Sequence, residues 1–251
     1  MLEKTNGVVL RIIPFTNTSQ IVSLLTESGN KLSLICKEAC RPKSIFRGQY
    51  DFFYTCEFLY QYKPTRTMFF AKEAYPYELR PYFRTNWRAA HCASWLCALV
   101  NVVVVGQLPG VYRLLEESLD LLNSPVYPDA EILARFELRL LRLLGLLPNF
   151  AFSCRCELEA QRQYRFNIAD GKLMCAEHES ECLRYNEPAL LVNSNVVQLA
   201  NQLVDGVGVT KYSLDTMRKL LRLLGLFINY HIDGLPIAGR ETCIKSLLPS
   251  H

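Results

Sequence analysis

The sequence predicts an α+β fold, in which a small five-stranded β-barrel precedes a helical domain that carries a zinc-finger-like loop. Roughly the first 75 residues form short runs rich in β-branched and aromatic residues, with no helical period between them. After Pro81 the spacing of apolar residues becomes helical. Two close pairs of metal-ligand residues, Cys154 with Cys156 and Cys175 with His178, then follow the helix over 129–145. We therefore expect a barrel domain over residues 1–79 and a helical domain over 80–251, with a zinc-finger-like insertion over 149–188.

The barrel is predicted from five segments with strand character and from the turn chemistry between them. The segments are residues 7–13, 21–26, 31–36, 51–62 and 66–71. Residues 27–30, Glu-Ser-Gly-Asn, have the composition of a tight turn between the second and third strands. The sequence Lys63-Pro64-Thr65 breaks the pattern before the fifth.

Helices are predicted over residues 85–105, 111–123, 129–145 and 213–232. Asp129 is expected to cap the third of these, which ends at Gly145 with Pro148 just beyond it. Ser213 is expected to cap the last. In the leucine-rich third helix the expected core residues are Leu133, Phe136, Leu140 and Leu144.

Composition excludes several classes of protein. The chain has 251 residues, of which half are apolar, so it can bury a sizeable core. Its net charge is only +4, so any contact with nucleic acid must come from local clusters of charge. Glu3 and Arg11 flank and interrupt the first apolar run, unlike a signal peptide. The longest apolar stretch, residues 92–105, is too short to span a bilayer.

These features favour a cytoplasmic protein without a disulfide framework. Several of the ten cysteines lie within apolar patterns and are expected to pack as small hydrophobic residues. They are Cys36, Cys56, Cys92 and Cys97.

The remaining cysteine pattern indicates a structural zinc site. The predicted ligands are Cys154, Cys156, Cys175 and His178. Cys182 could replace the histidine if a longer reach is needed. The alternative is a degenerate finger in which these are ordinary thiols, because a one-residue spacer between the first two is awkward. A catalytic zinc is disfavoured, and with no phosphate loop or nucleophile elbow we expect no enzyme activity.

Basic side chains cluster in the loop after the third strand. They are Lys37, Arg41, Lys43 and Arg47, with aromatic residues close by at positions 46, 50, 52 and 53. Lysine and arginine on a loop suit phosphate contact, and aromatic rings can stack bases. A solvated loop in front of core aromatics is the alternative.

A second basic pattern lies on the helix over 129–145. Arg135, Arg139 and Arg142 recur at steps of four and three residues and so share one helix face. This pattern indicates either a solvated basic stripe or a site for an acidic peptide.

The order of these segments resembles the RecO family of bacterial recombinational DNA repair proteins. The similar pieces are residues 7–11, 21–26, 29–32, 37–44, the helix Arg-Phe-Glu-Leu-Arg-Leu-Leu-x-x-Leu-Gly over 135–145, and weakly the Lys-Ser-x-Leu of 245–248. The N-terminal pieces and the 135–145 helix are fairly specific. The pieces run in the same order over most of the chain.

The resemblance implies an N-terminal barrel of the OB type, a helical domain and, in many members, a four-ligand zinc finger. It implies binding of single- and double-stranded DNA, with Arg11, Lys37, Arg41, Lys43 and Arg47 as the matching contacts. It further implies strand annealing, partnership with RecR, contact with the C-terminal tail of single-strand-binding protein at the Arg135 face, indirect action on RecA, and a place at the bacterial nucleoid.

The sequence departs from the family pattern in its basic loop and in its finger. Glu38 stands where glycine is usual and Cys40 where arginine is usual, and both weaken the positive field of the loop. The first cysteine pair is Cys-x-Cys, and His178 stands where cysteine is commoner. These departures keep a second interpretation open, a helical adaptor that binds repair partners without strong DNA binding.

Overall fold

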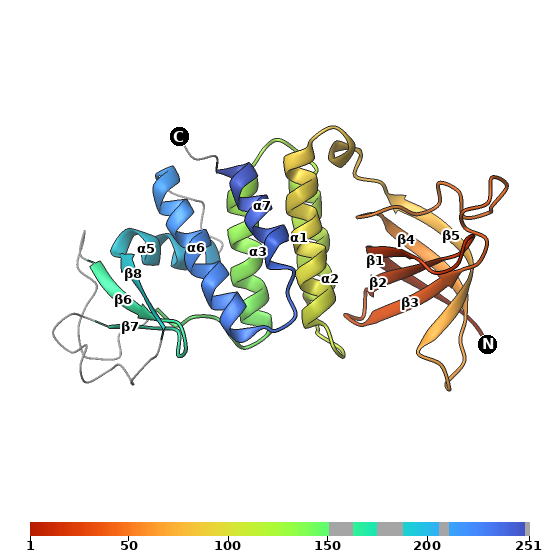
Figure 1. Cartoon of the computed structure of the whole chain (residues 1–251), viewed down its shortest axis with the longest axis horizontal. Coiled ribbons are helices and arrows are strands. Elements are labelled where there is room, and N and C mark those ends of the chain that lie inside the picture. The colour runs from red at the N-terminus through yellow and green to blue at the C-terminus, as the bar shows by residue number, and fades with distance from the viewer. Residues whose placement is uncertain (151–162, 175–187, 206–210, 249–251) are drawn as a thin grey trace. The chain divides into compact units, whose positions relative to one another are not determined.

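The computed structural model describes residues 1–150, 163–174, 188–205 and 211–248. The chain forms two compact units, Met1–Tyr127 and Pro128–His251 (Figure 1). The strands of the first unit end at Glu78, close to the predicted domain end at 79, but two further helices belong to the same unit. Among the helices described, none is long and apolar enough to cross a bilayer.

Five strands form a closed barrel, so the predicted barrel followed by helices is confirmed. The strands are β1 (Leu2–Pro14), β2 (Gln20–Thr26), β3 (Lys31–Cys36), β4 (Thr55–Gln61) and β5 (Met68–Glu78). Their order around the barrel is β1-β2-β3-β5-β4, and antiparallel pairing of β4 with β1 closes it. The turn predicted at 27–30 is present, with the Gly29 amide 2.8 Å from the Thr26 carbonyl.

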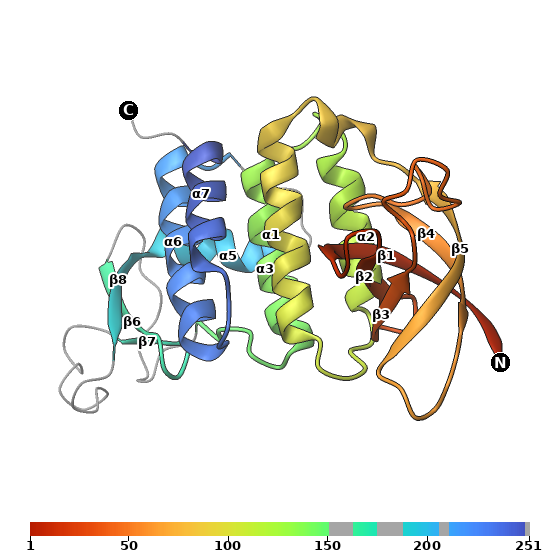
Figure 2. The same cartoon turned by 45° about the vertical axis from the view of Figure 1, so that its right-hand side comes forward.

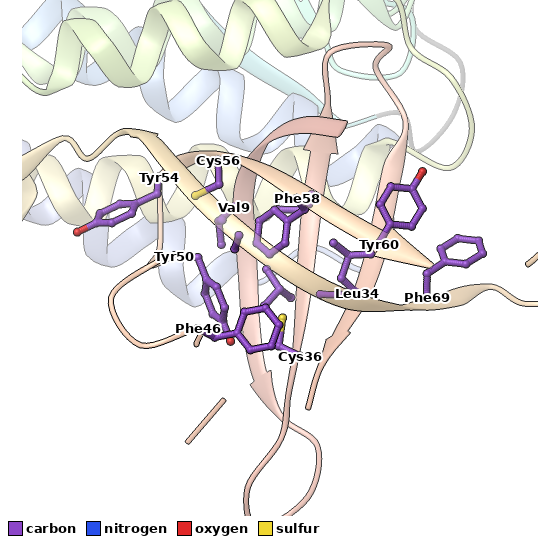
Figure 3. Packing of buried hydrophobic residues seen from close by; sticks show 14 residues of the cluster. Val9, Leu34, Cys36, Phe46, Tyr50, Tyr54, Cys56, Phe58, Tyr60 and Phe69 are labelled. Carbon is purple, nitrogen blue, oxygen red and sulfur yellow. The ribbon is translucent and has the colours of Figure 1, made fainter. Parts of the chain in front are cut away.

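Aliphatic and aromatic side chains from all five strands fill the barrel interior (Figure 3). Val9, Leu34 and Phe58 are completely buried there. Val8 is equally buried although alternation turns it outward, since helix α1 packs against β1. Cys36 and Cys56 lie in this core as predicted, and burial raises the pKa of each thiol to about 12.

The fourth and fifth strands differ from the expectation in their lengths. The fourth begins at Thr55 and not at residue 51, because a turn in which the Tyr54 amide bonds the Asp51 carbonyl precedes it. Phe53 in that turn has φ of 69°. The fifth continues to Glu78 and not 71, because it stays paired with β4 along the whole length of that strand.

Arg80 joins the barrel to the helices of the first unit, α1 (Trp87–Val103) and α2 (Val111–Leu122), which follow the 3₁₀ helix η1 (Pro81–Arg84). Its guanidinium is fully buried and donates from Nε to Asp120 Oδ1 of α2 over 2.7 Å. Nη1 donates to the Phe53 carbonyl over 2.6 Å and to the Thr55 hydroxyl over 3.0 Å. One side chain therefore links α2, the turn before β4 and β4 itself.

In the second unit three helices pack against a central helix, α3 (Asp129–Leu143) (Figure 2). They are α5 (Ser194–Asp205), α6 (Leu214–His231) and α7 (Ile237–Leu247). The Ser213 cap is confirmed, since its hydroxyl accepts the Thr216 amide over 3.1 Å. The Asp129 cap is wrong. Pro128 occupies the N-cap position and its carbonyl accepts the first amides, which makes Asp129 the first helical residue.

A three-stranded antiparallel sheet, in the order β7-β6-β8, was not predicted, and neither were α5 and α7. Its strands are β6 (Gln163–Asn167), β7 (Lys172–Met174) and β8 (Ala189–Asn193). The hairpin β6–β7 lies inside the segment 149–188 that was assigned to the finger-like insertion. All four predicted zinc ligands of that insertion lie outside the described residues.

A buried ion pair fastens α7 to the rest of the second unit. Arg240 donates from Nε and Nη2 to the two carboxylate oxygens of Glu137, each over 2.7 Å, and from Nη2 to the Leu221 carbonyl over 2.8 Å. The Glu137 side chain is 0% exposed and that of Arg240 8%. Gly225 of α6 lies directly against the guanidinium, and a β-carbon there would overlap it. The absence of a side chain at Gly225 makes room for the pair.

We expect Gly225→Ala to destabilise the protein by about 2–4 kcal/mol, because displacing the guanidinium breaks a buried pair whose loss outweighs the roughly 1 kcal/mol gained in helix propensity. Gly239→Ala on α7 is the matched control, since a β-carbon at that position would meet nothing within 4 Å. Denaturant unfolding of both variants measures the difference. Equal stability of the two alanine variants would contradict this account.

Candidate nucleic-acid interface

A basic hollow of about 400 Å³ opens on the barrel surface beside β3 and β5. We call it the β3–β5 hollow. It contains four cations and no acidic side chain, and its aromatic and aliphatic residues come from β5 and from the loop that follows β3. Its lining is Lys37, Ile45, Phe46, Gln61, Lys63, Arg66, Phe70, Ala71 and Lys72. A surface of this composition attracts anions and offers apolar area to what it binds.

Phe70 lies within contact range of two of the cations. The Lys37 ammonium is 4.4 Å from the centroid of its ring, and the Arg66 guanidinium carbon is 5.4 Å from it. Both distances are within the range of cation–π attraction, which holds the charged groups close to the ring. The ring is only partly buried. This arrangement places positive charge and an aromatic surface side by side, the combination that suits a phosphate with its attached base.

Parallel pairing of β3 with β5 brings these residues together. Leu34 lies opposite Phe69, and Ile35 lies opposite Phe70. Because side chains alternate along a strand, Phe69 enters the core and Phe70 remains at the surface. Lys37 follows directly after the last residue of β3, which brings it over Phe70.

The predicted DNA-binding residues are all exposed, but only Lys37 lines the hollow. Arg11 is exposed on β1, and Lys43 is exposed in the loop after β3. Arg41 forms an ion pair of 3.1 Å with Glu38, in which both side chains are more than half exposed. Arg47 donates to the Pro42 carbonyl over 3.1 Å, which closes the loop on itself. Such exposed contacts are weak and leave the charges accessible.

Glu38 adopts the left-handed conformation, with φ of 59°. Glycine adopts this conformation without strain, whereas a glutamate held there costs on the order of 1 kcal/mol. Glu38, which stands where the family pattern has glycine, therefore occupies a position whose backbone conformation favours glycine. Its carboxylate also engages Arg41, so it lowers the positive charge of the loop in the way that the sequence indicated.

The three arginines of α3 have different environments. Arg135 is largely buried, at 19% side-chain exposure, and pairs with Glu131 over 3.0 Å. Arg142 is exposed and lies 3.6 Å from Asp205 of α5. Arg139 is partly exposed. Of the core residues predicted on this helix, Leu133, Phe136 and Leu140 are buried, and Leu144 is partly buried.

Within the part of the chain that the structure describes, no three His, Cys, Asp or Glu side chains gather into a site that could hold a metal ion. The predicted ligands Cys154, Cys156, Cys175 and His178 are not among those residues. Metal binding by this chain therefore stays a prediction.

Sequence reasoning missed Lys63, Arg66, Phe70 and Lys72. A signal for the first two was available, since two cations flank the Pro-Thr break in the barrel pattern. Phe70 and Lys72 share one strand face, as residues two apart do. Their meeting with Lys37 depends on a pairing between strands more than 30 residues apart, which no local pattern indicates.

Comparison with known proteins gives the chain its family. Residues 1–79 match the family model "Recombination protein O N terminal", and residues 84–241 match "Recombination protein O C terminal". The DNA repair protein RecO of Alkaliphilus metalliredigens is 27% identical over 98% of this chain and 100% of its own length. That of Exiguobacterium sp. is 29% identical over 72% of each chain, and that of Syntrophus aciditrophicus 26% identical over 97% and 93%. With one family model matched on the barrel and the other on the helices that follow it, the chain belongs to the RecO family of DNA repair proteins.

Proposed function

We propose that this chain is a non-enzymatic recombination mediator in DNA repair. It binds single- and double-stranded DNA, anneals complementary strands and, together with RecR, helps RecA to load. The β3–β5 hollow is the observation that carries the DNA-binding step of this proposal, because four cations and an aromatic ring converge there without an acidic neighbour in the lining.

The loop of residues 37–47 extends the same positive surface. Lys37 belongs to both the hollow and the loop, so phosphates bound in the hollow continue toward Arg41, Lys43 and Arg47. Contacts to phosphate carry no sequence information, which suits a protein that must act at any DNA gap.

Replacing both Lys63 and Arg66 by glutamine should weaken single-stranded DNA binding and flatten its dependence on salt by about 1.4 in slope, because each lost phosphate contact removes about 0.7 for a single strand. The matched control is Lys4→Gln with Arg113→Gln, which removes two exposed cations of the same unit that already pair with Glu57 and Glu117. Fluorescence anisotropy with a labelled oligonucleotide at several salt concentrations measures the slopes, and an annealing assay follows each variant.

If both double variants change the slope equally, only net charge matters and the hollow is not the interface. Salt-insensitive or absent DNA binding in the unaltered protein would instead favour the helical adaptor, which binds repair partners alone.

We further propose one structural zinc per chain, bound by Cys154, Cys156, Cys175 and His178, with Cys182 as the substitute ligand. Metal analysis should find close to one equivalent. Cys175→Ser should release the metal and lower the unfolding temperature, because a bound zinc contributes folding energy. Cys40→Ser, which removes an exposed thiol of the barrel unit, should retain it. Protein prepared without chelators that contains no zinc would establish the degenerate finger.

The α3 face is proposed to bind the acidic C-terminal tail of single-strand-binding protein. Arg139 and Arg142 are the accessible charges, whereas Arg135 is occupied by Glu131 and supports the helix. Arg139→Ala with Arg142→Ala should lower affinity for a labelled tail peptide at least tenfold, since a charge-assisted contact contributes about 1.5–3 kcal/mol. The control is Lys172→Ala with Lys219→Ala, which removes two exposed cations of the same unit and should leave the peptide affinity unchanged. Equal peptide affinity of the two double variants would exclude this face.

A further inference from the structure

Trp87, the first residue of α1, is 55% exposed. The chain has two tryptophans, and the other, Trp95 on the same helix, is only 3% exposed. A large aromatic ring exposed to water does not contribute the hydrophobic stabilisation that its burial would give the folded protein. A lone exposed aromatic residue is ordinary in proteins, so its surroundings decide what it means.

Arginines precede and follow Trp87 in the sequence, and one of them contacts the indole. The Arg88 guanidinium carbon is 5.6 Å from the centroid of the indole, and the His91 ring meets the indole edge-on at the same centroid distance. Just before α1, Arg84 lies over the ring of Tyr54 and bonds its hydroxyl. From residue 79 to residue 115 the sequence contains no aspartate or glutamate. The exposed indole therefore lies in a stretch of chain that carries arginines and no acidic side chain.

The start of α1 is held in place before any ligand arrives. The side-chain oxygen of Asn86 accepts the amides of Arg88 over 3.1 Å and Ala89 over 3.2 Å. His91 Nδ1 lies 2.8 Å from the Trp87 carbonyl. Because the capping side chain already occupies these amides, the helix end offers no amide cradle for an anion. Any attraction comes from the guanidinium groups and the indole.

We infer that Trp87 is a stacking platform for an unpaired nucleobase, with Arg84 and Arg88 holding the phosphates on either side of it. An indole stacks on any base, and guanidinium groups bind phosphate through paired hydrogen bonds. The ligand is thus a single-stranded nucleic acid, and in that respect the inference rests on the proposed function.

This platform is separate from the β3–β5 hollow. The hollow lies at the beginning of β5, next to the β4–β5 hairpin. The chain reaches α1 only after the end of β5, and Figures 1 and 2 both show it entering α1 at the end of the first unit away from that hairpin. Two separate contacts allow one chain to hold two segments of strand at the same time.

The two tryptophans make the test direct. In a Trp95→Phe protein, Trp87 is the sole tryptophan. Its fluorescence emission should fall as poly-deoxythymidine oligonucleotide is added, because a stacked base quenches the indole. Acrylamide should then quench the remaining emission less, because the base covers the indole. In the matched Trp87→Phe protein, which retains the buried Trp95, the emission should stay constant. Trp87→Leu should weaken single-stranded DNA binding about tenfold or more, whereas Trp87→Phe retains a ring and should weaken it less.

Circular dichroism first establishes that each variant is folded. Unchanged Trp87 emission on saturation with DNA, together with unchanged affinity of Trp87→Leu, would overturn the inference and leave the indole to a protein partner. Adding Lys63→Gln and Arg66→Gln to the Trp95→Phe protein separates the two proposals. If DNA still quenches Trp87 emission and the Lys63→Gln and Arg66→Gln changes leave DNA affinity unaltered, the platform is supported and the hollow is refuted. If those two changes lower DNA affinity but DNA leaves Trp87 emission unchanged, only the platform is refuted.

Discussion

Parallel pairing of β3 with β5 is the constraint on which the first unit depends. It joins strands separated by the whole of β4, and without it the remaining antiparallel pairs leave an open sheet with exposed edges. The same pairing sends Phe69 inward to the core and keeps Phe70 outward, close to two cations. Closure of the barrel and assembly of its basic surface are therefore one event, and a loss of register would remove both.

Arginine has two distinct uses in this chain, and burial separates them. Arg80 and Arg240 are withdrawn from water, each with a carboxylate and a backbone carbonyl as partners, and each joins elements distant in sequence. Arg66 and Arg88 lie on aromatic rings at the surface. A buried guanidinium depends on hydrogen bonds within the protein, which Arg80 makes through Nε and Nη1 and Arg240 through Nε and Nη2. A guanidinium on a ring keeps donors available for a phosphate.

Local chemistry was enough for the sequence to determine much of the architecture. The residues of β3 were predicted with its observed bounds, and those of α2 and α6 to within a residue, because apolar period and capping chemistry are local properties. Burial of Cys36, Cys56, Cys92 and Cys97 followed from their apolar neighbours. The errors also have local causes. Pro128 displaced Asp129 from the cap, and the strands of the second sheet, of three to five residues each, are too short to show a clear period.

Only the tertiary structure decided which charges act together. The sequence indicated that Lys37 belongs to a basic loop, but its meeting with Lys63, Arg66 and Lys72 depends on strand pairing across the barrel. It placed Arg135, Arg139 and Arg142 on one face of α3, where the pairing of Arg135 with Glu131 is a local contact one helical turn apart. Only the fold buries that pair and brings Asp205 of α5 close to Arg142. The sequence states which residues carry a charge. Whether a charged side chain is accessible to a ligand depends on its neighbours and on its exposure to water, and both are properties of the folded chain.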